Sequence, residues 1–520
     1  MADQLIRDIF DEYIFNELPT HLLYVPDMKL MGRSDVRKHF KYVLQEIEHE
    51  LDGISGGDEQ RRYASIRKLV KQKVKYAVLS HRWLDEGEPT FQEISRGESG
   101  DEPGYDKLMA FCEKAKLFGC DFVWSDTCCI DKTSSAELDE AIRSMFRWYR
   151  NAHMCIAYLA DSCTIADFEN EIWFRRGWTL QEVLAPWRMK FYGKGWIPFS
   201  GDDNDKGSEG AIMLAISRLT KIPMDDLISF SPGKDRVREK MSWASKRRTT
   251  RIEDVAYSLV GMFDVSLMVA YGEGRRAFYR LLEAIIQSSD DCDVFYWKGP
   301  RSPYSAALPA SPCCYAPRGE STGHRASSID SDSPRGALIK PGSAFSGTQW
   351  LLDAKLFASG GDKLFALTNH GLRLKVLLVR MNSDGTSESR STESALSAEA
   401  GMRMRKVVFR HEDLEDVVVE DPIPYRDDMD INWAVGIIDY WQSYEKGCVD
   451  TRRGHPFTAF LLYNVGLPRR GHGPRGFFRG ELEGERWGKV ETNNIVEIRP
   501  KRFLEDALIT LYVRESCRDI

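Results

Sequence analysis

Residues 74–80, VKYAVLS, form a short run of apolar, β-branched and aromatic residues that ends at the polar sequence HRW (81–83). This pattern predicts a buried strand. Similar runs follow at 120–126 (CDFVWSD) and 153–160 (HMCIAYLA), and the segments between the runs have apolar residues at helical spacing. Strands that alternate with helices predict an α/β fold with a mainly parallel sheet flanked by helices. Ligands of such sheets bind outside the carboxyl ends of the strands.

The rest of the chain differs from this segment in composition and hydrophobic periodicity. The full length of 520 residues exceeds what one hydrophobic core usually fills. We predict five parts from the changes in composition and periodicity. They are a helical lead at 1–75, the α/β core at 76–200, a helical closing segment at 201–298, a Ser/Pro/Gly-rich linker at 299–346, and a β-rich domain at 347–520 with a disordered loop at 382–401.

Composition excludes several classes of function. The 72 basic and 79 acidic residues give a formal net charge of −7, which argues against a nucleic-acid partner. The N-terminus lacks the pattern of a signal peptide, and no run of about 18 apolar residues predicts a membrane span. The 11 cysteines include no C-x-x-C pair, so we expect reduced thiols, a cytoplasmic location and no bound metal.

The segment WFRRGWTLQEVLAP (173–186) contains the main candidates for binding or catalysis. In it, Trp178 and Glu182 are four residues apart. On a helix this spacing places both on one face. A carboxylate beside an indole can stabilise positive charge on a sugar ring or bind ribose hydroxyls. The alternative is structural, with Trp178 in the core and Glu182 solvated or in a salt bridge.

Four blocks of sequence resemble, in order, the signature of the fungal HET (heterokaryon incompatibility) domain over about residues 76–200. The resemblance implies a role in non-self recognition and programmed cell death, a form of fungal innate immunity. The segment TRIEDVAYSLVGMFDV…YGEGRRAFYRLLEAI resembles the region that follows this domain in large HET proteins. The blocks are YAVLSHRW (76–83), DFVWSDTCCID (121–131), ELDEAIRSMFRWYRNAHMCIAYLAD (137–161) and WFRRGWTLQEVLAP (173–186).

HET domains are considered distant relatives of TIR domains, several of which hydrolyse NAD with a Glu four residues after a helical Trp. Trp178-Thr-Leu-Gln-Glu182 is similar to that pattern, so the resemblance implies that Glu182 is catalytic and that the sheet is TIR-like. It also places Ser80, His81, Arg82 and Trp83 where a TIR loop borders the nucleotide. The sequence departs from the TIR pattern because residues 84–104 contain no separate TIR-like loop motif.

Each nucleotide-binding candidate has a physical role and a structural alternative. Arg82 can pair with a diphosphate, or with Asp85 or Glu86. Trp83 or Trp178 can stack on a base, whereas Trp83 can instead pack at the sheet edge. Asp126, at the end of a strand, can face the ligand or cap the turn at Thr127 and Cys128.

Three further motifs carry weaker signals. Cys128 or Cys129 with His81 or His153 has the residue types of a thiol nucleophile and base, but buried cysteines are usually inert. The string GEGRRA (272–277) matches G-x-G-x-x-A, although a helix start is the better interpretation. The basic cluster KRRTTR (246–251) is expected to cap and solvate a helix.

The resulting hypothesis is hydrolysis of NAD at the nicotinamide–ribose bond, with Glu182 stabilising the ribosyl cation and NAD as substrate rather than cofactor. One alternative is a non-enzymatic signalling module that acts by self-association or by recruiting other incompatibility proteins. A second alternative is binding or hydrolysis of another nucleotide in the same cleft.

Overall fold

The computed structural model describes residues 2–51, 59–98, 100, 102–207, 210–289 and 291–317, together with strand segments between 365 and 513. Two compact units divide the chain. The first comprises Met1–Ile285 and Ala310–Cys313, and the second comprises Ile286–Pro309 and Cys314–Ile520.

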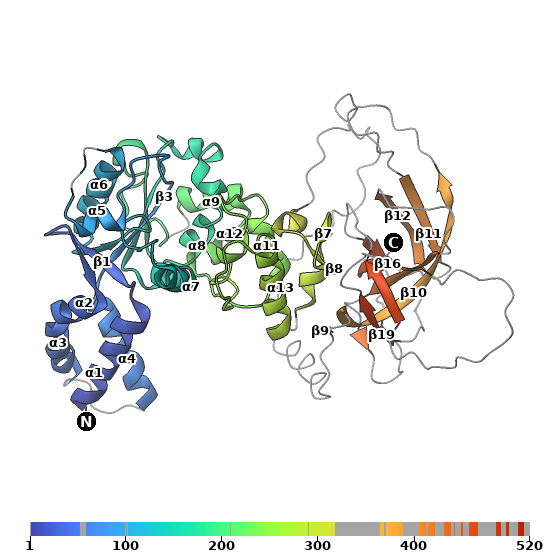
Figure 1. The fold of residues 1–520 in the computed structure, drawn as a ribbon, viewed down its shortest axis with the longest axis horizontal. Coiled ribbons are helices and arrows are strands. Elements are labelled where there is room, and N and C mark those ends of the chain that lie inside the picture. Colours follow the sequence, from blue (N-terminus) through green and yellow to red (C-terminus); the bar gives the residue numbers. More distant parts are fainter. Residues whose placement is uncertain are drawn as a thin grey trace. The chain divides into compact units, whose positions relative to one another are not determined.

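A six-stranded sheet in the order β2-β1-β4-β3-β5-β6 forms the centre of the first unit (Figure 1). Strands β4, β3, β5 and β6 run parallel, and β1 joins β4 in antiparallel pairing. This confirms the predicted α/β fold with a mainly parallel sheet. The strands are β1 (His21–Tyr24), β2 (Lys29–Gly32), β3 (Ala77–His81), β4 (Phe122–Trp124), β5 (Met154–Tyr158) and β6 (Met189–Tyr192).

Strand β3 lies inside the sheet, between β4 and β5. Every one of its side chains is buried, as expected for a strand covered on both faces. After β3 the chain adds β4 on one side and then β5 on the other side. The crevice between the carboxyl ends of β3 and β5 is therefore a topological switch point, the usual ligand position in such sheets.

Helices α6 (Pro103–Leu117) and α7 (Ser135–Asn151) provide the crossover connections. Ser134 caps α7, since its side chain accepts a hydrogen bond from the backbone N–H of Glu137. Two tyrosines fasten α7 to β3: the hydroxyl of Tyr76 donates to the carbonyl of Trp148 (2.5 Å), and the hydroxyl of Tyr149 donates to the carbonyl of Leu79 (2.8 Å). The Tyr76 bond holds the chain just before β3, and the Tyr149 bond holds β3 near its carboxyl end, where the candidate site lies.

The N-terminal part contains more than the predicted helices. Figure 1 shows the N-terminal helices gathered beside β1, and the hairpin β1–β2 extends the sheet beyond β4. The sequence signal for this hairpin is weak because each strand has only four residues. The helices are α1 (Ala2–Glu12), η1 (Tyr13–Glu17), α2 (Arg33–His39), η2 (Phe40–Tyr42), α3 (Val43–Leu51) and α4 (Glu59–Lys73), and α5 (Phe91–Ser95) follows β3.

Short helices follow β5 and β6. Thr250 and Glu253 have the sequence spacing of a capping box, which predicts a helix start there. Glu253 does not form this box, because its carboxylate accepts the backbone N–H groups of Gly272 (2.8 Å) and Gly274 (3.0 Å) instead. The helices are η3 (Ile165–Glu169), η4 (Ile172–Arg175), α8 (Thr179–Leu184), η5 (Lys194–Trp196), α9 (Ala211–Thr220), α10 (Met224–Ile228), α11 (Val237–Ala244), α12 (Asp254–Tyr257) and α13 (Arg276–Ser288).

The second unit is rich in β-strands. Its nine-stranded sheet has the order β12-β11-β10-β13-β16-β17-β19, with β9 paired to β10 and β18 paired to β16. The strands are β9 (Phe365–Thr368), β10 (Gly371–Ser387), β11 (Arg405–His411), β12 (Leu414–Asp421), β13 (Ile431–Ile437), β16 (Phe457–Val465), β17 (Glu485–Lys489), β18 (Val496–Ile498) and β19 (Leu508–Val513). A separate pair is formed by β14 (Trp441–Gln442) and β15 (Val449–Asp450).

Two predicted irregular stretches carry regular structure where they are described. Within the predicted linker lie the hairpin of β7 (Arg301–Ser302) and β8 (Ser305–Pro309) and the turn η7 (Pro312–Tyr315); η6 (Cys292–Phe295) precedes them. Residues 318–346 lie outside the described residues. The predicted disordered loop begins inside β10, which extends to Ser387, and residues 388–401 lie outside the described residues.

None of the helices described in the structure combines the length and apolar character that a bilayer crossing requires.

Gly261 gives a stability test of the packing against α7. An added methyl group at Gly261 would lie 2.2 Å from Cβ of Phe146. The buried Phe146 side chain cannot relieve this clash by changing its rotamer, because Cβ is fixed by the backbone. We expect Gly261→Ala to destabilise the first unit by about 1–3 kcal/mol, as overpacking does, and to lower its melting temperature. Gly201→Ala is the matched control, since nothing lies within 4 Å of its added methyl group. Equal melting temperatures for the two variants would contradict this packing.

Candidate functional site

Glu182 lies on α8 and is held at the carboxyl end of β3. Its carboxyl group is buried, with 5% of the residue exposed. The hydroxyl of Ser80 donates to Oε2 of Glu182 at 2.5 Å, and the indole N–H of Trp173 donates to the same Ser80 oxygen at 2.9 Å. Trp173, Ser80 and Glu182 therefore form a directed chain of hydrogen bonds that joins η4, β3 and α8.

The environment of Glu182 favours its neutral form. Burial and the negative charge of Asp126 raise the pKa of Glu182 to about 8, against the lowering effects of the Ser80 hydrogen bond and of Arg176 and Arg247. At neutral pH most molecules therefore hold a proton on this carboxyl group. A carboxyl group with a pKa this close to neutrality can exchange its proton during a reaction.

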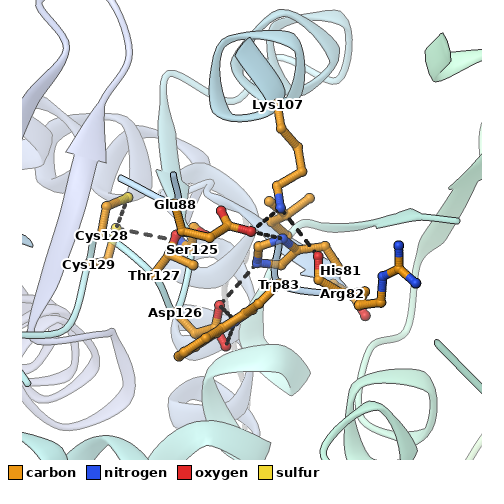
Figure 2. Close-up of polar contacts among 12 residues, drawn as sticks. His81, Arg82, Trp83, Glu88, Lys107, Ser125, Asp126, Thr127, Cys128 and Cys129 are labelled. Atoms are coloured by element: carbon orange, nitrogen blue, oxygen red, sulfur yellow. Dashed lines mark hydrogen bonds and ion pairs between the residues drawn. The ribbon is translucent and has the colours of Figure 1, made fainter. Parts of the chain in front are cut away.

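Asp126 and its neighbours form a second cluster at the ends of β3 and β4 (Figure 2). Nε2 of His81 lies 3.1 Å from Oδ1 of Asp126, and the indole N–H of Trp83 contacts both carboxylate oxygens at 3.1 and 3.0 Å. Burial acts to raise the pKa of Asp126, but the contacts with His81 and Trp83 and the charge of Lys132 lower it overall. Asp126 therefore carries its charge in this cluster and does not cap the turn that follows.

A buried lysine extends this cluster. Nζ of Lys107 on α6 contacts the Glu88 carboxylate and donates to the carbonyl of Arg82 at 3.3 Å, while Glu88 also accepts from the N–H of Leu84 (Figure 2). Neither Glu88 nor Lys107 is among the candidate residues predicted from the sequence. The available signal is the position of Lys107 on the buried face of α6, four residues before Phe111, where an apolar residue is expected.

Two predicted nucleotide-binding residues are engaged elsewhere. Nη1 of Arg82 pairs with Asp161 at 2.9 Å, not with Asp85 or Glu86, and Figure 2 shows its guanidinium group pointing away from His81 and Asp126. Trp178 precedes the first turn of α8, and its indole donates a hydrogen bond to Asp254. The structure thus brings together Ser80 with Glu182, and His81 and Trp83 with Asp126, whereas Arg82 and Trp178 have other partners.

The basic cluster at 246–251 contains a residue that turns inward. Arg247 donates through Nη1 to the carbonyl of Arg176 and to the hydroxyl of Thr179, both at 2.9 Å. The expectation that this whole cluster is a solvated helix cap is therefore wrong for Arg247. Its sequence neighbours Lys246 and Arg248 are exposed, so the cluster itself gives no signal that identifies the inward-facing member.

The remaining motifs do not form the reactive or ligand-binding sites that their residue types would allow. Contact with Cys129 and burial raise the pKa of the Cys128 thiol, which disfavours the nucleophilic thiolate, and His153 contacts Arg188 instead of a cysteine. The carboxylate of Glu253 occupies the amides of Gly272 and Gly274, as the preferred helix-start interpretation allows. Among the described residues, no group of three or more His, Cys, Asp or Glu side chains is arranged to hold a metal ion.

Comparison with known proteins agrees with the sequence blocks around β3, β4 and β5. The family model described as "Heterokaryon incompatibility protein (HET)" matches residues 76–169. The chain is also 40% identical over 229 residues to "Vegetative incompatibility protein HET-E-1" of Podospora anserina. That match covers 42% of this chain and 16% of the relative, so the chain spans a minor part of the relative's length. No solved structure matches the chain.

Ser80, His81, Arg82, Trp83 and Asp126 fall inside the matched residues, and Glu182 follows them on α8. The matched segment contains β3, β4 and β5, with the helices between them. The order of the four sequence blocks, the family match and the relative agree, and the chain therefore carries a heterokaryon incompatibility (HET) domain at residues 76–169.

Proposed function

We propose that this protein acts in heterokaryon incompatibility by hydrolysing NAD at the nicotinamide–ribose bond, as a TIR-type glycohydrolase does. The family match and the name of the Podospora relative support the biological role. One observation carries the chemistry: the buried carboxyl group of Glu182, with a pKa raised to about 8, is hydrogen-bonded to Ser80 at the carboxyl end of β3. Depletion of a shared cofactor explains how such a reaction leads to cell death.

The position of Glu182 fits the proposed substrate. Ser80 pairs in register with Ala157 of β5, so Glu182 is anchored beside the β3–β5 switch point where α/β sheets bind ligands. Water is largely excluded there, which strengthens the interaction between a carboxylate and a cation. The positively charged nicotinamide ring of NAD favours ionisation of a neighbouring carboxyl group, so substrate binding itself promotes the active carboxylate.

The proposed reaction is a substitution at the ribose C1′ atom. The bond from C1′ to the nicotinamide nitrogen breaks, and its electron pair neutralises the pyridinium ring as nicotinamide leaves. The ionised Glu182 stabilises the oxocarbenium-like ribosyl cation. A water molecule then adds to C1′ and loses a proton, which gives ADP-ribose and nicotinamide.

A non-enzymatic signalling module, acting by self-association or by recruiting other incompatibility proteins, is the second candidate. It is favoured by the partners of Arg82 and Trp178, because Arg82 pairs with Asp161 and Trp178 binds Asp254 instead of facing Glu182. Under this proposal, cell death does not depend on the carboxyl group of Glu182. The same variant therefore separates the two candidates.

We expect Glu182→Gln to lower nicotinamide release by at least about 100-fold, because the amide cannot stabilise a developing cation. Nicotinamide is measured by chromatography after purified full-length protein is incubated with NAD. The control is Glu169→Gln, an exposed carboxylate at the end of η3. Cell killing by the Glu182→Gln variant at the wild-type level would favour the signalling module, and turnover of a different nucleotide by the wild type would favour the other-nucleotide alternative.

The pH profile tests the ionised form of Glu182. The carboxylate is the active species and its pKa is raised to about 8, so kcat/KM should increase from pH 6 and level off above pH 8. Ser80→Ala removes a hydrogen bond that lowers this pKa, so the midpoint should move to higher pH. A midpoint near pH 4.5 in the wild type would contradict the raised pKa of Glu182, and a midpoint that Ser80→Ala leaves in place would show that Glu182 does not control the rate.

A further inference from the structure

Arg176 and Arg247 lie side by side next to α8. Arg176 follows η4 directly, and a backbone bridge joins it to Arg248 of the segment after α11. The N–H of Gly177 donates to the carbonyl of Arg248 at 2.8 Å, and Nη1 of Arg247 donates to the carbonyl of Arg176. The bridge therefore places the two guanidinium-bearing residues on adjoining backbone segments.

Both guanidinium groups keep buried N–H groups without a partner. Nε of Arg176 and Nη2 of Arg247 are inaccessible to solvent and make no hydrogen bond among the described residues. Each residue as a whole is of intermediate exposure. Native proteins satisfy most buried polar groups, and an exception commonly marks the place of a water molecule or an ion.

No carboxylate among the described residues forms an ion pair with either arginine, although both arginines lower the pKa of Glu182. Glu182 is protonated in most molecules at neutral pH and accepts a hydrogen bond from the hydroxyl of Ser80. The two positive charges are thus left without a counter-ion in a partly buried position. Because burial also lowers the pKa of Arg247 to about 10, this arrangement is costly to the free protein.

We propose that Arg176 and Arg247 form the binding site for a phosphate or diphosphate group of the nucleotide whose sugar faces Glu182. This inference rests on the proposed function, and it assigns the anionic part of the substrate. Guanidinium groups bind phosphate oxygens through paired, charge-assisted hydrogen bonds, and the unpartnered Nε and Nη2 atoms are donors of this kind. The site also replaces Arg82, which is paired with Asp161, as the expected diphosphate ligand.

Binding of inorganic pyrophosphate to the full-length protein, measured by isothermal titration calorimetry, tests the site. We expect Arg176→Gln and Arg247→Gln each to weaken binding by about tenfold or more, since each removes a charged hydrogen-bond donor. Arg175→Gln is the matched control: it removes the same charge one residue away, from an exposed side chain that binds the carbonyl of Glu169. It should change the dissociation constant by less than about twofold, the screened effect of one surface charge.

Arg176→Gln keeps the test independent of folding, because no side-chain hydrogen bond of Arg176 is lost among the described contacts, whereas Arg247→Gln removes the bonds to Arg176 and Thr179. No pyrophosphate binding by the wild type, or equal weakening in Arg176→Gln and Arg175→Gln, would overturn the inference.

Glu182→Gln separates this inference from the proposed reaction. It should retain pyrophosphate binding, because the amide adds no negative charge beside the arginines, while it loses nicotinamide release. If the wild type releases no nicotinamide but binds pyrophosphate through Arg176 and Arg247, the reaction fails and the anion site stands. If nicotinamide release depends on Glu182 but pyrophosphate binding is the same in all arginine variants, the anion site fails and the reaction stands.

Discussion

The hydrogen bond from Ser80 to Glu182 is the contact on which the candidate site depends. It joins the central strand β3 to α8 across 102 residues of sequence, in a position where both side chains are buried. Ser80 also accepts a hydrogen bond from Trp173, so its hydroxyl proton is directed toward Glu182. A buried carboxyl group needs such a partner, and the partner fixes the place of the carboxyl group relative to the sheet.

The charges around Glu182 are complementary to a ligand that carries both signs. Glu182 provides a latent negative charge, which appears when a nearby cation lowers its raised pKa. Arg176 and Arg247 provide positive charge with unpartnered donors. NAD, the substrate we propose, has a positively charged nicotinamide ring and a negatively charged diphosphate, so one molecule of it would match both features. A simple phosphate ester matches the arginines alone.

The apolar runs at 74–80, 120–126 and 153–160 were sufficient to predict β3, β4 and β5, because fully buried parallel strands contain few polar residues. The hairpin β1–β2 was missed because four-residue strands have too short an alternation to detect. Glu182 was selected for its spacing from Trp178, yet its contacts are with Ser80, a residue on another element. Such pairings over long sequence separation depend on the tertiary fold, as does the inward turn of Arg247.

The cluster around Asp126 is coupled to Glu182 even though no hydrogen bond joins them. The negative charge of Asp126 is, after burial, the main cause that raises the pKa of Glu182. His81, Trp83 and Lys132 stabilise that charge, and Lys132 lies over the Trp83 ring at 4.2 Å. A ligand that brings positive charge to Asp126 would offset this charge and lower the pKa of Glu182. The proton affinity of Glu182 therefore depends on the charge that lies next to Asp126.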